Sequence, residues 1–206
     1  MTATLIGIAE TRIKGSRPTL MQKLARSGSR FHSFLTRLNL DDGVSEEIHI
    51  VARTPEGKLP KNMMSMLFTN VSDGFAFSGL QQKFHGAVSS VGLQRHELFL
   101  TAEFARRERD ISAFDAFHAL PSFNQPTQEE RDALWERITE SAQKFNESRI
   151  LYNPFNRHGG PVNCRSGVIA VLKTAGLDIT GEQVDWRVPY PFQDVTTQVC
   201  AQDSCS

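Results

Sequence analysis

Alternating apolar and polar residues predict two consecutive β-strands in the first quarter of the chain. Residues 30–40, RFHSFLTRLNL, and residues 46–53, EEIHIVAR, carry apolar side chains at strand-like spacing. The Asp-Asp-Gly sequence at 41–43 between them is typical of a turn. We therefore expect the two strands to pair as an antiparallel hairpin. Residues 96–103, HELFLTAE, alternate in the same way and predict a further strand.

Two later segments have helical spacing. Residues 127–146 open with Thr127 as a candidate cap and with acidic residues in the first turns, where the helix dipole favours negative charge. A second helix is predicted to begin at Cys164, directly after the capping residue Asn163. Its apolar residues cover most of the circumference, which indicates a buried helix, and Gly176 is expected to end it. The pattern as a whole predicts an α+β fold in which an antiparallel sheet packs on the buried helix that carries the cysteine.

The length of 206 residues fits a single domain. Hydrophobic residues make up 39% and charged residues 22%, the proportions of an ordinary globular protein, which excludes a disordered chain. Within the domain of residues 1–206, we expect residues 1–28 to be a lead-in segment, residues 76–125 an insertion and residues 195–206 a tail.

Charge and hydropathy exclude several partner classes. The 23 basic residues equal the 23 acidic ones, which removes the usual electrostatic reason for a nucleic-acid partner. No apolar run approaches the roughly 18–20 residues of a membrane span, so no transmembrane segment is expected. The N-terminus lacks the basic region of a Sec signal peptide, which predicts synthesis in the cytoplasm without such a signal.

The cysteines away from the predicted helix do not indicate a metal site. Cys200 and Cys205 have no CxxC pair and no spaced histidines beside them, so neither a structural zinc nor any other cofactor is expected. A disulfide between these two cysteines would need an oxidising compartment.

Cys164 is the candidate nucleophile. A thiol at the start of a helix lies near the positive end of the helix dipole and near unpaired backbone N–H groups, and both favour the reactive thiolate. The same N–H groups can stabilise the oxyanion that forms when a thiolate attacks a carbonyl carbon. The alternative is a structural cysteine, because free cysteine is among the most buried residue types.

A cysteine nucleophile needs a base, usually histidine, that is held by a third polar group. His32 and His49 lie on the two predicted strands of the hairpin, and apolar residues flank each of them. His158 competes for the role of base because it lies six residues before Cys164, next to Gly159 and Gly160. We expect His32 to be the base, because a strand fixes a side chain better than a glycine-rich loop does.

The register of the hairpin decides whether the two strand histidines touch. A tight turn centred on residues 42–43 sets His49 opposite Thr36, and His32 then lies on the same face roughly 13 Å away. Direct contact between the histidines requires a turn nearer residues 40–41, or a bulge. A shared face is therefore expected, whereas contact depends on the register.

The order of these residues resembles the circularly permuted branch of the NlpC/P60 papain-like superfamily. That branch includes lecithin:retinol acyltransferase-like proteins and various bacterial amidases and effectors. Its members carry a histidine on an early strand and a second polar residue on the next, matched here by His32 and His49. The cysteine follows at a helix start, often inside a Tyr…Asn-Cys segment, matched by Tyr152 and the Asn-Cys pair at 163–164. The resemblance spans roughly residues 30–176 and implies a papain-like fold.

Two departures set the chain apart from the acyltransferase group of this branch. Arg-Ser-Gly follows the Asn-Cys pair, where the acyltransferase group has Glu-His-Phe. A C-terminal membrane anchor like that of the acyltransferase group is not expected either. Both differences argue against a lipid acyltransferase.

The resemblance implies a thiol hydrolase that cleaves amide bonds through an acyl-enzyme, with Cys164 as nucleophile, His32 as base and His49 as its orienting partner. The substrate-binding residues it implies are Tyr152, His158, Gly159, Gly160 and Asn163. In the wider superfamily the usual substrate is a peptidoglycan stem peptide, cut at a bond that involves D-glutamate and a diamino acid. With no Sec signal, the chain would suit a type VI antibacterial effector that acts in a target-cell periplasm, with an immunity protein and a secretion carrier as partners.

Two alternatives stay open. The same site would serve a host-directed protease, deamidase or acyltransferase effector, because either water or an amine can resolve an acyl-enzyme. A non-catalytic α+β interaction domain would instead keep Cys164 buried, unreactive and distant from every histidine.

Overall fold

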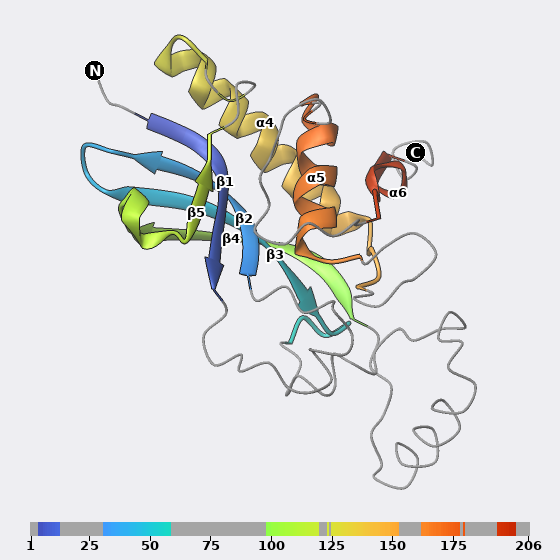
Figure 1. The fold of residues 1–206 in the computed structure, drawn as a ribbon. Coiled ribbons are helices and arrows are strands. Elements are labelled where there is room, and N and C mark those ends of the chain that lie inside the picture. The colour runs from blue at the N-terminus through green and yellow to red at the C-terminus, as the bar shows by residue number, and fades with distance from the viewer. Residues whose placement is uncertain are drawn as a thin grey trace, which may run out of the picture.

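An antiparallel sheet with helices on one of its faces forms the described part of the protein (Figure 1). The structure is a computed structural model, and it describes residues 4–12, 31–58, 98–119, 123, 125–152, 162–177, 179 and 193–200. The sheet has five strands in the order β4-β3-β2-β1-β5. The predicted α+β class, with an antiparallel sheet packed on the helix that begins at Cys164, is confirmed.

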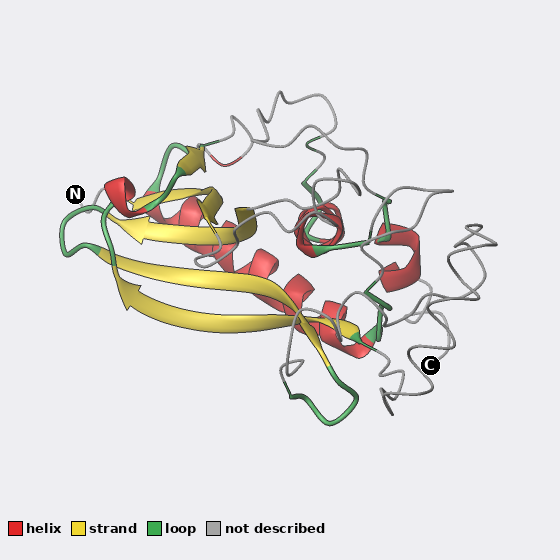
Figure 2. Ribbon diagram, turned by 60° about the horizontal axis from the view of Figure 1, so that its bottom comes forward, coloured by secondary structure: helices red, strands yellow, loops and turns green. Residues whose placement is uncertain are grey.

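The strands are β1 (Thr4–Arg12), β2 (Phe31–Asn39), β3 (Val44–Arg53), β4 (Phe99–Glu108) and β5 (Ala116–His118). The helices are the 3-10 turn η1 (Ile111–Ala113), α4 (Gln128–Glu147), α5 (Cys164–Thr174) and α6 (Thr196–Cys200). Figure 2 shows the long helix α4 running along the sheet, and the shorter helices α5 and α6 lie toward the right in this view. Among the described residues, no helix combines the length and the hydropathy that crossing a bilayer requires.

The two predicted helices form for the expected reasons. Thr127 caps α4 in a capping box with Glu130, and the apolar face of α4 packs into the core. Asn163 caps α5, whose apolar residues are almost all buried between the sheet and α4. The helix α5 ends before Gly176, whose φ of +80° lies in the left-handed region that favours glycine.

The predicted hairpin forms, and its register lies between the two that the sequence left open. His49 pairs with Phe34, and Thr36 pairs with Glu47, so His49 is opposite neither Thr36 nor His32. The pairing centres the turn between residues 41 and 42 rather than on residues 42–43. Gly43 adopts a positive φ of 66° and its N–H closes the turn on the carbonyl of Asn39 at 3.0 Å, which makes the connection longer than a two-residue turn.

Three expectations about the domain boundaries need correction. Residues 4–12 of the expected lead-in 1–28 form β1, an inner strand between β2 and β5. Residues 99–118 of the expected insertion 76–125 supply β4 and β5, so they belong to the main sheet. In the expected tail 195–206, Val195 and Val199 are buried in the main core. Residues 13–28, 76–97 and 201–206 lie outside the described part of the chain.

The sheet opens between β2 and β3 at one end. Pairing of β2 with β3 stops at Phe34 and His49, whereas β2 continues beside β1 to Phe31 and β3 continues beside β4 to Arg53. The helix α5 packs against both strands at this end, and Gly167 faces the side chain of Ile50 there. The opening therefore brings the start of α5 to the unpaired edge of β2.

Gly167→Ala is expected to destabilise the fold. A Cβ atom at this position would lie 2.4 Å from Cγ2 of Ile50 and 3.1 Å from Cζ of Phe145. Helix propensity favours alanine by about 1 kcal/mol, but overpacking a tight core costs about 1–3 kcal/mol. We expect a net loss of about 1–2 kcal/mol in the free energy of unfolding, measured by denaturant titration.

Ile50→Ala provides the control, because of the three nearest atoms it removes both that belong to Ile50 and leaves only Cζ of Phe145. Gly167→Ala should cost much less in the Ile50→Ala background than in the wild type. Equal costs in the two backgrounds would contradict the close packing of α5 on β3.

Candidate active site

Cys164 is the first residue of α5, and its backbone is fixed by the cap of the helix. The Asn163 side chain accepts hydrogen bonds from the N–H groups of Arg165 at 2.9 Å and Ser166 at 3.5 Å. The Ser166 hydroxyl in turn accepts a hydrogen bond from the Asn163 N–H at 3.3 Å. The side-chain oxygen of Asn163, one of the residues expected to bind substrate, is therefore engaged in holding the helix start.

The partly buried Cys164 contacts the unpaired edge of β2. Its thiol is hydrogen-bonded to the side chain of His32 and to the backbone of Ser33. Pairing between β2 and β3 ends one residue later, at Phe34, so the backbone of Ser33 at this edge is accessible to the helix. The opening in the sheet thus brings together the predicted nucleophile and the predicted base.

The surroundings of Cys164 favour its thiolate. Burial raises the pKa of the thiol, but the hydrogen bond and the charge of His32, the Ser33 backbone and the Arg165 guanidinium together lower the pKa below its ordinary value. A lowered thiol pKa increases the thiolate fraction at neutral pH, and the thiolate is the nucleophilic form.

The second predicted histidine contacts the first. Nε2 of His32 lies 3.0 Å from Nδ1 of His49, so Nδ1 of His32 is the nitrogen that remains for Cys164. Because His49 is opposite Phe34, His32 is its diagonal neighbour across the two strands, within reach of a long side chain. The contact therefore forms between diagonal neighbours, with the turn centred one residue nearer to residues 40–41 than a turn on residues 42–43 would be, and without direct pairing of the two histidines. The Phe34 ring stacks on His49 with ring centroids 4.3 Å apart.

Glu47 extends this chain of side chains, and the sequence interpretation missed it. Its Oε2 lies 2.7 Å from Nε2 of His49, and its side chain is 0% exposed. The signal was present in the Glu-x-His spacing at residues 47–49, because residues two apart on a strand share a face.

Tyr152 lies close to Cys164, as its expected role requires. Burial raises the pKa of its phenol, and the negative charge of the Cys164 thiolate raises it further. The phenol therefore stays protonated and can donate a hydrogen bond near the sulfur. The other expected substrate-binding residues, His158, Gly159 and Gly160, lie outside the described residues.

A buried ion pair ties α5 to the face of the sheet that the helix covers. Nη2 of Arg165 donates to Oε1 of Glu10 at 3.1 Å, and the two residues are 3% and 0% exposed. The Ser33 hydroxyl donates to the same Glu10 oxygen at 2.9 Å. Because Arg165 follows Cys164 directly, this ion pair holds the helix start at the sheet. Sequence reasoning missed it, because Glu10 interrupts an apolar run and lies 155 residues from Arg165 in the chain.

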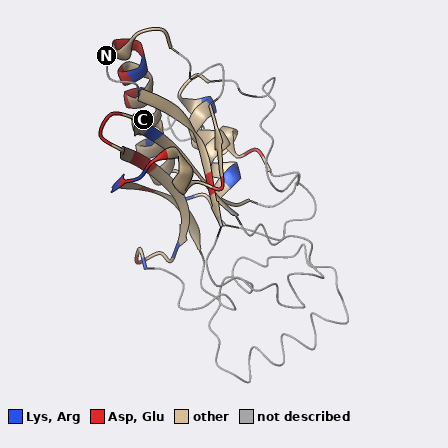
Figure 3. Ribbon diagram, turned by 60° about the vertical axis from the view of Figure 1, so that its left-hand side comes forward, with Lys and Arg blue, Asp and Glu red and all other residues tan. Residues whose placement is uncertain are grey.

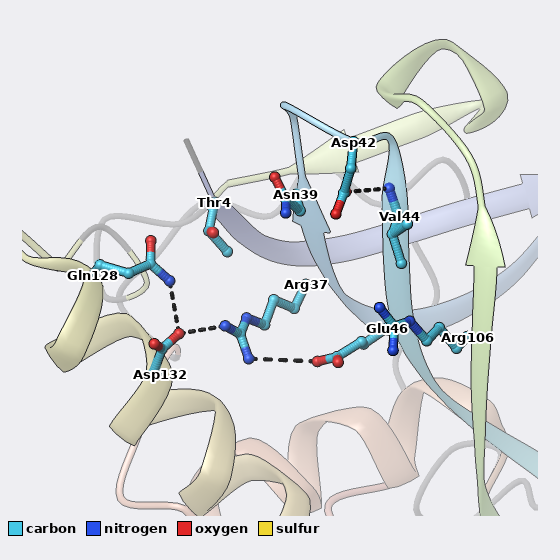
Figure 4. A pocket seen from close by; sticks show the side chains of 9 residues that line it. All are labelled: Thr4, Arg37, Asn39, Asp42, Val44, Glu46, Arg106, Gln128 and Asp132. Atoms are coloured by element: carbon cyan, nitrogen blue, oxygen red, sulfur yellow. Dashed lines mark hydrogen bonds and ion pairs between the residues drawn. The ribbon is translucent and has the colours of Figure 1, made fainter. Parts of the chain in front are cut away.

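A separate open cavity of about 310 Å³ lies at the hairpin end of the sheet, away from Cys164 (Figure 4). Its lining residues are Thr4, Arg37, Asn39, Asp42, Val44, Glu46, Arg106, Gln128 and Asp132. Arg37 is paired there with both Glu46 and Asp132. None of the predicted site residues lines this cavity, and its central cation is already balanced by two carboxylates.

Neither the charged residues nor the potential metal ligands among the described residues indicate a second candidate site. Acidic and basic residues are mixed along α4, and residues of both signs also occur on the strands (Figure 3). Across the described ranges, no group of three or more His, Cys, Asp or Glu side chains is arranged to hold a metal ion.

Arg165→Ala is expected to destabilise the fold strongly, because it leaves the buried Glu10 carboxylate without its guanidinium partner. Breaking a buried pair on one side costs about 3–5 kcal/mol. Arg37→Ala is the control, since its partners are partly exposed and such pairs are worth at most about 1 kcal/mol. Equal losses in the two variants, measured by denaturant unfolding, would contradict an anchoring role for Arg165.

Comparison with known proteins assigns no family to the chain. No protein-family model, no curated protein and no solved structure matches it.

Proposed function

We propose that the protein is a cysteine hydrolase that cleaves amide bonds through an acyl-enzyme. The observation that carries this proposal is the Cys164 thiol at the start of α5, hydrogen-bonded to His32 while the other ring nitrogen of His32 lies 3.0 Å from His49. Thiol-dependent acyl transfer requires a nucleophile, a base and a third group that orients the base. The non-catalytic alternative required Cys164 to be distant from every histidine, and the contact with His32 counts against it.

The first half of the reaction forms the acyl-enzyme. His32 takes the thiol proton through Nδ1, and the Cys164 sulfur attacks the carbonyl carbon of the scissile amide. The resulting oxyanion is stabilised by the backbone N–H of Cys164 at the start of α5, since the next two N–H groups of the helix donate to the Asn163 side chain. The tetrahedral intermediate then collapses, the C–N bond breaks, and His32 gives its proton to the leaving amine.

The second half releases the acyl group. His32 removes a proton from a water molecule, and the hydroxide attacks the thioester carbonyl. The C–S bond breaks, the thiolate regains a proton from His32, and a carboxylic acid leaves. His49 supports both halves because its contact with Nε2 holds the His32 ring in one orientation.

The substrate proposal rests on the resemblance to the permuted NlpC/P60 branch. We propose a peptidoglycan stem peptide as the substrate and a role as an exported antibacterial effector, with an immunity protein and a secretion carrier as partners. The Tyr152 phenol near Cys164 supports a substrate-binding role for this residue. A host-directed protease, deamidase or acyltransferase would use the same residues, and product analysis separates these activities.

The variant series Cys164→Ala, His32→Ala, His49→Ala and His158→Ala tests the assignment of roles. We expect no turnover without the thiol, a loss of about a thousandfold or more without His32, a smaller loss without His49 and the smallest loss without His158. The measurement is digestion of muropeptides followed by mass spectrometry of the products.

Thermal melting of each variant provides the control for folding. Full turnover by Cys164→Ala would refute the catalytic proposal. A dead His158→Ala variant together with an active His32→Ala variant would refute the assignment of the base. A mass change on a host protein, with intact muropeptides, would favour the host-directed alternative.

A further inference from the structure

A row of polar side chains runs from Cys164 through His32 and His49 and ends at the buried carboxylate of Glu47. Glu47 lies on β3 two residues from His49, and its side chain is fully enclosed. Its Oε2 contacts Nε2 of His49 at 2.7 Å, and its Oε1 accepts a hydrogen bond from the Ser45 hydroxyl at 2.9 Å. The mechanism proposed above does not use this carboxylate.

The surroundings keep Glu47 ionised. Burial raises the pKa of Glu47, but the hydrogen bonds from His49 and Ser45 and the nearby Arg109 lower it overall. The guanidinium groups of Arg107 and Arg109 lie 3.5 Å and 3.4 Å from its two oxygens. An ionised carboxylate only accepts hydrogen bonds, so Nε2 of His49 must carry the proton between the two groups.

The position of that proton determines the tautomers of both His49 and His32. Burial lowers the pKa of His49, and although the hydrogen bond to Glu47 opposes this effect, the pKa remains below its ordinary value. A neutral His49 with its proton on Nε2 has a bare Nδ1, which can only accept from Nε2 of His32, 3.0 Å away. A neutral His32 with its proton on Nε2 then presents a bare Nδ1 to Cys164, and this is the form that can accept the thiol proton.

We propose that Glu47 is a positioning residue that sets the tautomers of His49 and His32, so that His32 faces Cys164 as a base. The role rests on the proposed hydrolase function, and it also predicts how the thiol behaves in the absence of any substrate. Glu47 further stabilises the positive charge that His32 gains when it takes the thiol proton, since His49 transmits the hydrogen bond between them.

Other charged groups lie near His49 and Cys164 and also influence the protonation of these residues. Arg107 disfavours a positive charge on His49. Glu103 on β4 pairs with His49 across the sheet, and its carboxylate is engaged by Arg53. At the other end of the row, Arg165 and Tyr152 interact with Cys164. None of these groups contacts His49 at Nε2, where Glu47 does.

Glu47→Gln tests the proposal, and Glu46→Gln is the matched control. The Glu47→Gln substitution keeps the size of the side chain, but it removes the charge and no longer forces the His49 proton onto Nε2. Glu46 neighbours Glu47 on β3, pairs with Arg37 at 3.5 Å and makes no contact with the histidines. The readouts are the pH dependence of Cys164 alkylation by iodoacetamide, mapped by peptide mass spectrometry to separate it from Cys200 and Cys205, and kcat and KM for amide cleavage.

We expect Glu47→Gln to move the midpoint of alkylation to higher pH and to slow alkylation below that midpoint by about tenfold or more, because the thiolate loses part of its stabilisation. In cleavage assays kcat should fall roughly 10- to 100-fold with KM nearly unchanged. Glu46→Gln should match the wild type in both measurements. A merely structural role for Glu47 would lower thermal stability without moving the midpoint.

The experiments distinguish a failure of the role proposed for Glu47 from a failure of the proposed hydrolase function. A shifted midpoint in a chain that cleaves no amide would support the role of Glu47 and refute the hydrolase. Active cleavage with the same midpoint and kcat in Glu47→Gln and the wild type would overturn the role of Glu47 alone. If Glu47→Gln does not fold, nitrogen NMR of the wild-type histidines decides, because protonation of Nε2 in both His32 and His49 supports the proposal and protonation of Nδ1 in either overturns it.

Discussion

The contact between the start of α5 and the unpaired edge of β2 is the constraint on which the rest of the site depends. It exists because β2 and β3 separate beyond Phe34 and His49, which lets a helix on one face of the sheet reach a histidine directed to the other face. Without this opening, Cys164 would pack on a closed sheet, and the sheet itself would lie between it and His32. The topology therefore accounts for the site more directly than any single side chain does.

Two buried acidic residues support this contact from opposite faces of the sheet. Successive residues of β2 point to opposite faces, so Ser33 meets Glu10 and Arg165 beneath the helix, while His32 meets His49 on the other side. The pair of Glu10 and Arg165 holds the helix start in place, whereas Glu47 acts on the protonation of the histidines. Position and protonation of the reacting groups are thus controlled by separate residues.

The sequence could predict the parts of the structure that hydrophobic periodicity and capping determine. The hairpin, the helix after Thr127 and the helix that begins at Cys164 follow from such local patterns. The strand β1 could not be recognised, because Glu10 interrupts its apolar run and the partner that neutralises this carboxylate, Arg165, is 155 residues away in the chain. The contact between His32 and His49 depends on the geometry of the turn around Gly43, which composition does not determine.

The titration of Cys164 tests the central claim most directly. The ultraviolet absorbance of the thiolate, followed with pH in the wild type and corrected with Cys164→Ser, reports this one sulfur. The account predicts that the thiolate persists below the ordinary cysteine pKa of about 8.5, and that His32→Ala moves its titration upward because burial then acts without the opposing imidazole. A thiol that titrates at or above about 8.5 and does not respond to His32→Ala would contradict the account.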